Sequence, residues 1–162
     1  MHPVRLLAKC TARGVAITGA GFGGTTEVTA QDVAGALGMG SLSPECAWAV
    51  QAKFCADNVA TEKLKVWLTG WVEQECVRKQ LTTRHSAALA FAACWEFVWQ
   101  PSEPLSARRR SALTMSVGGQ PAISKTQMAA HWMPVITLAV QELTACEERA
   151  LRHLWRQFDH AA

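Results

Sequence analysis

At 162 residues, the chain has room for one compact domain, or for a smaller domain with arms. With 49% hydrophobic and 18% charged residues, it is too apolar for a disordered protein, and its longest apolar run, residues 87–95, is about half as long as a membrane span. The net charge of +3 does not by itself indicate binding of nucleic acid, and residues 1–3 do not start a signal peptide, so we expect a cytoplasmic protein without membrane contact.

Residues 1–28 differ in composition from the rest of the chain and are predicted to form a flexible basic arm. Five of the eleven glycines lie here, together with three basic residues and one acid. Gly19, Gly21 and Gly24 match the G-x-G-x-x-G pattern of a dinucleotide-binding turn. That turn needs a helix after its last glycine and a parallel sheet behind it, and neither is predicted here. A glycine-rich arm is therefore the favoured interpretation.

From Thr29 onward, apolar residues recur with helical spacing, and almost no segment alternates with a period of two. Four helices are predicted before residue 100, and they begin near Thr29, Ser43, Thr61 and Thr83. The second is expected to run to about residue 58. The fourth is apolar on all sides over residues 87–95, so we expect it to be the buried central helix.

After a break at residues 101–104, which contain two prolines, further helices are predicted. Ser106 begins a short basic helix. Ser124 and Gln127 have the spacing of a capping box, and the helix that they open should kink or restart at Pro134. A long amphipathic helix follows toward the C-terminus.

These elements predict an all-α fold, a helical bundle that forms one domain over residues 29–162 and contains a helix-turn-helix at about residues 106–140. The order there is a basic helix, a glycine-containing turn and a capped polar helix. Because the first residues of the second helix of such a motif enter the major groove, base contacts are predicted for Lys125, Thr126, Gln127 and His131. Phosphate contacts are predicted for Arg108, Arg109 and Arg110. The alternative is a solvated charge cluster beside a loop, because the turn is longer than usual.

No constellation of residues predicts catalysis, a cofactor or a metal site. The six cysteines contain no CxxC pair, and without a secretion signal we expect them to stay reduced. The acidic pairs Glu73/Glu75 and Glu147/Glu148 fit solvated helix faces, and most of the seven tryptophans fit core positions better than a base-stacking platform. We therefore expect a protein that is not an enzyme. A nucleotide-dependent enzyme is the rival that the glycine pattern leaves open.

Three groups of residues, in this order, carry a resemblance to a known family. Residues 29–40 (TAQDVAGALGMG) and 52–55 (AKFC) are similar to the family's segments DV-x-x-A-x-GM and A-x-F-C, and the alanine-rich residues 87–94 follow. Residues 111–115 (SALTM), a turn, and a helix containing Thr126 and Pro134 are similar to its A-V-T-M, turn and proline-interrupted DNA-reading helix. On these segments the chain resembles the Q-type late-gene antitermination proteins of lambdoid bacteriophages, in their lambda-like branch.

The resemblance implies a protein that binds double-stranded DNA at a phage late promoter and engages RNA polymerase paused downstream, through the primary sigma factor and the core enzyme. The polymerase then reads through terminators. For this sequence, the resemblance implies base contacts by Ser124, Lys125, Thr126, Gln127 and His131, with phosphate support from the arginines at 108–110. Whether one or two copies bind the DNA stays open, and the arm is a candidate for polymerase contact.

Residues 100–107 depart from the family pattern. Lambda-like members carry two CxxC pairs that form a zinc finger between the central helix and the helix-turn-helix, whereas the residues in that place here include no cysteine. No zinc is therefore expected, and any contact that the finger makes in relatives is not carried over. A helix-turn-helix repressor or activator that acts only at initiation remains the alternative function.

Overall fold

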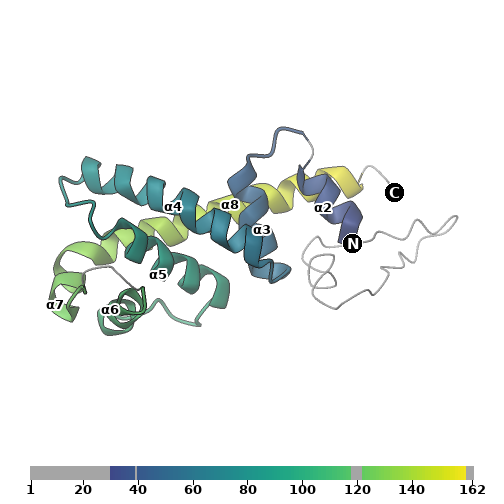
Figure 1. Ribbon diagram of the computed structural model, residues 1–162. Coiled ribbons are helices and arrows are strands. Elements are labelled where there is room, and N and C mark those ends of the chain that lie inside the picture. Colours follow the sequence, from purple (N-terminus) through teal and green to yellow (C-terminus); the bar gives the residue numbers. More distant parts are fainter. Residues whose placement is uncertain (1–29, 39, 118–121, 160–162) are drawn as a thin grey trace, which may run out of the picture. The chain divides into compact units, whose positions relative to one another are not determined.

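The computed structural model describes residues 30–38, 40–117 and 122–159, and all regular secondary structure in these ranges is helical (Figure 1). The elements are α2 (Ala30–Gly38), α3 (Pro44–Phe54), α4 (Asn58–Arg78), α5 (Ser86–Trp99), α6 (Ala107–Met115), α7 (Lys125–Gln127), the π-helical turn η1 (Met128–Trp132) and α8 (Met133–Asp159). The predicted all-α fold is confirmed. The predicted arm and its G-x-G-x-x-G pattern lie outside the described residues.

The chain divides into two compact units. The first consists of Met1–Thr61 and Ala145–Ala162, and the second of Glu62–Thr144. The helices α4 and α8 each contribute one part to either unit. All eight residues predicted to contact DNA belong to the second unit. The single domain over residues 29–162 stays a prediction.

In the first unit, α3 packs against the C-terminal part of α8. Cys46 and Cys146 are both fully buried and hydrogen-bonded to each other, and burial raises the pKa of the Cys146 thiol to about 12. Lys53 forms an ion pair with Glu147, whose side chain is only 13% exposed. The prediction that Glu147 lies on a solvated face is therefore wrong, because its carboxylate is turned inward to a buried lysine.

The helix α4 begins three residues earlier than predicted from the sequence. The helix α3 ends at Phe54 rather than at about residue 58, and Ala56 then adopts a left-handed backbone (φ 49°) that a continuing helix would not allow. The carboxylate of Asp57 then accepts hydrogen bonds from the backbone N–H groups of Val59 and Ala60 at 2.9 and 3.1 Å. Asp57 is thus the N-cap, and α4 begins at Asn58 rather than at Thr61.

In the second unit, α5 is the predicted buried central helix. Its residues Ala88, Leu89, Ala90, Ala92 and Ala93 have no exposed surface. Along α4, a stripe of residues spaced by one helical turn is equally buried, namely Leu64, Leu68, Val72 and Cys76. Glu75 on the same helix is also buried and pairs with Arg78 at 2.9 Å, so the prediction that it is solvated is wrong as well. Of the seven tryptophans, only Trp132 is buried, Trp99 and Trp155 are exposed and the other four are half-buried, so the prediction of core positions holds fully for Trp132 alone.

Candidate nucleic-acid interface

The helix α6 begins as the sequence predicts, at Ser106. The backbone of Ser106, the N-cap, is extended (φ −65°, ψ 159°). The hydroxyl of Ser106 accepts a hydrogen bond from the backbone N–H of Arg109 at 3.4 Å. The three arginines that follow this cap point to different sides, since consecutive residues of a helix are about 100° apart. Arg108 and Arg109 are exposed, whereas Arg110 is only 1% exposed.

Arg110 is held inside the second unit by Glu96 of α5. Its Nε and Nη2 atoms each donate a hydrogen bond of 2.8 Å to the carboxylate, which is itself buried. Its Nη1 atom donates to the carbonyl of Met133 at 3.2 Å and to the hydroxyl of Thr137 at 3.0 Å. The predicted phosphate contact by Arg110 is therefore wrong, because the side chain is buried and all three of its nitrogens donate to these partners. Its position links α5, α6 and the start of α8.

The helix that follows the turn opens with the predicted capping box. The hydroxyl of Ser124 accepts from the backbone N–H of Gln127, and the side-chain oxygen of Gln127 accepts from the backbone N–H of Ser124, both at 3.2 Å. A π-helical turn follows directly before Pro134, where the N–H of Met133 bonds to the carbonyl of Met128. A wider turn accommodates the proline ring, which clashes with the preceding turn of a regular α-helix. The predicted break at Pro134 is thus a π turn within a continuous helical path.

This second helical segment has a buried and an exposed side. Met128 and Trp132 point inward, and Trp132 meets the ring of His85 edge-on at a centroid distance of 5.4 Å. All five residues predicted to contact bases are exposed, namely Ser124, Lys125, Thr126, Gln127 and His131. The exposed side also carries Ala129 and Ala130, whose short side chains leave room for close approach of another molecule.

Contacts between α6 and the second helical segment make the two a packed pair. The hydroxyl of Ser111 donates a buried hydrogen bond of 2.7 Å to the carbonyl of Ile123, which has no exposed surface. The helix α6 also contacts α5, α7 and η1. Between residues 104 and 140 the sequence contains no aspartate or glutamate, so no carboxylate of this segment offsets the exposed Arg108, Arg109 and Lys125.

Two of the five predicted base-contacting side chains already have a structural role. A bidentate contact of Gln127 to adenine needs its side-chain oxygen as an acceptor, and this oxygen is engaged by the cap. The hydroxyl of Ser124 is engaged in the same way. Within the described part of the chain, Lys125, Thr126 and His131 make no side-chain hydrogen bond, and these three are best placed to contact a ligand.

Comparisons of the chain with models of protein families, with curated proteins and with solved structures find no match. The resemblance to the antitermination proteins therefore depends on the sequence segments quoted above alone. None of the helices in the described ranges offers the apolar length that a bilayer span requires. Residues 100–106, which stand where lambda-like members have their zinc finger, form a short link from α5 to α6.

The role of Glu96 was missed in the sequence analysis, although a signal for it exists. Glu96 is the one charged residue in an otherwise apolar run from Ala87 to Trp99. A carboxylate on a buried helix requires a cationic or hydrogen-bonding partner. The run of three arginines begins twelve residues later, and one of them supplies that partner. Which arginine turns inward depends on the packing of α6 and is not contained in the local pattern.

Proposed function

We propose that this chain binds double-stranded DNA through α6 and the helical segment that begins at Lys125, acting as a helix-turn-helix. The observation that carries the proposal is the exposure of Lys125, Thr126 and His131 in the first turns of a helical segment packed against α6. A helix that presents its first residues outward in this way suits the major groove. The carbonyl of Met133, just after this segment, is bonded to the buried Arg110, which orients the segment.

The individual roles follow from exposure and from hydrogen bonding. Lys125, Thr126 and His131 contact base edges, where lysine can donate to guanine. Arg108 and Arg109 contact phosphates, which orients the protein on the duplex without reading its sequence. Ser124 and Gln127 hold the start of the helical segment through their capping box, so any base contact that they make competes with the cap.

Together with the family resemblance, this DNA-binding surface supports a late-gene antiterminator. In this proposal the protein acts in the cytoplasm of a bacterial host, binds at a phage late promoter and engages the paused RNA polymerase, including its primary sigma factor. Its effect comes from binding and not from covalent chemistry. The rival function, a regulator that acts only at initiation, uses the same DNA-binding surface and differs in what happens after the polymerase leaves the promoter.

A transcription assay with purified components separates these functions. The template carries the promoter upstream of the neighbouring late genes, followed by an intrinsic terminator, and terminator readthrough is measured with and without the protein. An antiterminator raises readthrough, and Lys125→Ala abolishes the effect while Lys79→Ala, a change at an exposed lysine outside the proposed interface, preserves it. A change in the amount of initiation without readthrough would favour the initiation-only regulator.

A further inference from the structure

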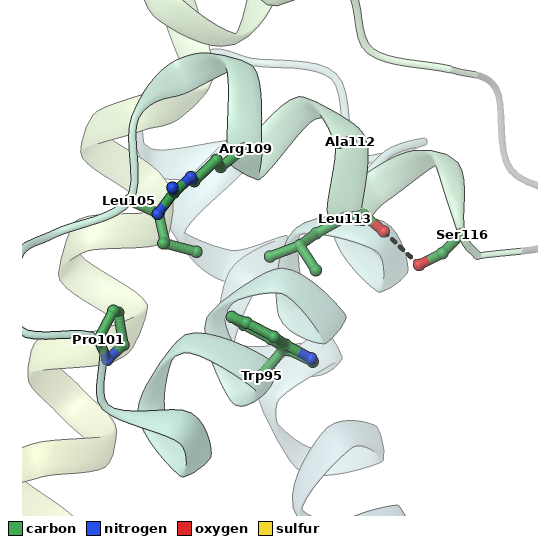
Figure 2. A pocket seen from close by; sticks show the side chains of 7 residues that line it. All are labelled: Trp95, Pro101, Leu105, Arg109, Ala112, Leu113 and Ser116. Carbon is green, nitrogen blue, oxygen red and sulfur yellow. Dashed lines mark hydrogen bonds between the residues drawn. The ribbon is translucent and has the colours of Figure 1, made fainter.

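A pocket of about 400 Å³ lies beside α6, on the side that carries Arg109 (Figure 2). Its walls come from the end of α5, from the link between the two helices and from α6 itself. Figure 2 shows Leu105 and Leu113 pointing toward Trp95 and Pro101 across this space. The volume is in the range of pockets that hold a large apolar group, and the lining is mostly apolar.

Two large exposed apolar side chains adjoin residues that line the pocket. Trp99 is 69% exposed and stacks on the pocket residue Trp95, with a ring-centroid distance of 5.9 Å and an interplanar angle of 27°. Met115 is 59% exposed and lies one helical turn after Ala112, which also lines the pocket. Large exposed apolar side chains beside a pocket mark sites of protein association, where tryptophan and methionine are enriched.

Charge indicates what kind of partner fits. Arg109 is the only charged residue that lines the pocket, and Arg108 next to it is exposed as well. The carboxylate of Glu96 does not compensate them, because it is buried and paired with Arg110. The one exposed acid in the neighbouring link is Glu103, so the exposed arginines outnumber the exposed carboxylates in residues 100–109. This balance favours a partner that brings its own carboxylate.

We propose that this α5–α6 pocket binds an acidic amphipathic segment of a partner protein. A bulky apolar side chain of the partner fills the space between Trp95 and Leu113, and a neighbouring carboxylate pairs with Arg109. The apolar side chains of Trp99 and Met115 cover the flanks of the segment. A small molecule held in the pocket would leave these two side chains exposed to water. This proposal does not depend on DNA binding, although both ligands meet at Arg109.

A peptide-display selection tests the proposal on the full chain. A library of 16-residue peptides with randomised side chains is selected against the wild-type protein and counter-selected against the support without protein. The peptides that are enriched are then synthesised, and their affinities are measured by fluorescence anisotropy for wild type, Trp99→Ala and Arg109→Ala. Trp155→Ala is the matched control, because Trp155 is the other exposed tryptophan and lies in the first unit.

We expect enriched peptides to combine a tryptophan, phenylalanine or leucine with aspartate or glutamate within one helical turn. Trp99→Ala should weaken their binding at least tenfold and Trp155→Ala less than twofold. Arg109→Ala should bring the affinities of an acidic peptide and of its amide counterpart within about twofold of each other.

Enrichment of basic or uncharged peptides, no enrichment, or equal binding to wild type and Trp99→Ala would overturn the proposal. If sedimentation shows that the wild type self-associates and that Trp99→Ala does not, the occupant of the pocket is a second copy of this chain, and the proposal of a partner protein is overturned. The DNA proposal is separable in the same proteins: Lys125→Ala should leave peptide affinity unchanged, and Trp99→Ala should leave DNA affinity unchanged.

Discussion

Replacing Arg110 by methionine should destabilise the second unit more than any change at the neighbouring arginines. The substitution keeps the length of an unbranched side chain but removes two hydrogen bonds to the carboxylate of Glu96, one to the carbonyl of Met133 and one to the hydroxyl of Thr137. Removing one partner of a buried ion pair leaves an uncompensated charge and costs about 3–5 kcal/mol. Since small domains are stable by about 5–15 kcal/mol, we expect the loss to be a large fraction of the total.

The double variant Glu96→Leu with Arg110→Met provides the decisive comparison. It removes both charges together, and the remaining losses are the acceptor for the Leu105 N–H and the donors to the Met133 carbonyl and the Thr137 hydroxyl. Each buried group left without its partner costs about 1–3 kcal/mol of the free energy of unfolding. The loss in the double variant should therefore be several kcal/mol smaller than the sum of the losses in the two single variants.

The assay is urea unfolding of the full chain, followed by far-UV circular dichroism. Arg108→Met is the control, because this arginine is exposed and its substitution should change the free energy of unfolding by no more than about 0.5 kcal/mol. If Arg110→Met cost less than about 1 kcal/mol, or if the two single changes were additive in the double variant, the role assigned to this pair would be refuted.

Three further outcomes are expected. Arg108→Ala should weaken binding to all duplexes about equally and reduce the slope of log affinity against log salt by about 1, as measured by a salt titration of DNA affinity; a loss confined to one sequence would contradict a phosphate contact. Ser124→Ala should lower the free energy of unfolding by about 0.5–2 kcal/mol through loss of the N-cap hydrogen bond to the backbone N–H of Gln127, and thermal unfolding that is unchanged would exclude that role. Burial raises the pKa of the Cys94 and Cys146 thiols to about 12, so both should react slowly with iodoacetamide at pH 8, as followed by mass spectrometry. Because the unfolded thiols ionise near pH 9 and the folded ones do not, these groups should contribute a loss of stability as the pH rises above about 9, and a gain of stability there would contradict the assignment.

Local patterns in the sequence were sufficient for most of the helices. The apolar run at residues 87–95 predicted the buried helix α5 because a helix that is apolar on all sides has no face suited to water. The caps at Ser106 and at Ser124 with Gln127 could also be predicted, because a cap depends on residues only three positions apart. Pro134, which lacks a backbone donor, predicted an irregularity in the helix, but not that the irregularity is a π turn.

Features that depend on tertiary contacts could not be predicted in this way. Arg110 was grouped with its two neighbours because a run of like charges is typical of a solvated face. Its partners, Glu96 and the carbonyl of Met133, are 14 and 23 residues away in the sequence. Glu147 was misjudged similarly, because its partner Lys53 is 94 residues away. In the candidate site, the capping box of Ser124 and Gln127 followed from local spacing, but the ion pair that removes Arg110 from the surface did not.

The most direct test of the central claim is the affinity of the full chain for double-stranded DNA. A duplex selected from a random library and a duplex of shuffled sequence are titrated at physiological salt with wild type and with Lys125→Ala. A DNA-reading helix should bind the selected duplex about 10³-fold more tightly than the shuffled one, and Lys125→Ala should weaken the first by about 1–3 kcal/mol while changing the second little. Equal affinity of the wild type for the two duplexes would contradict the account.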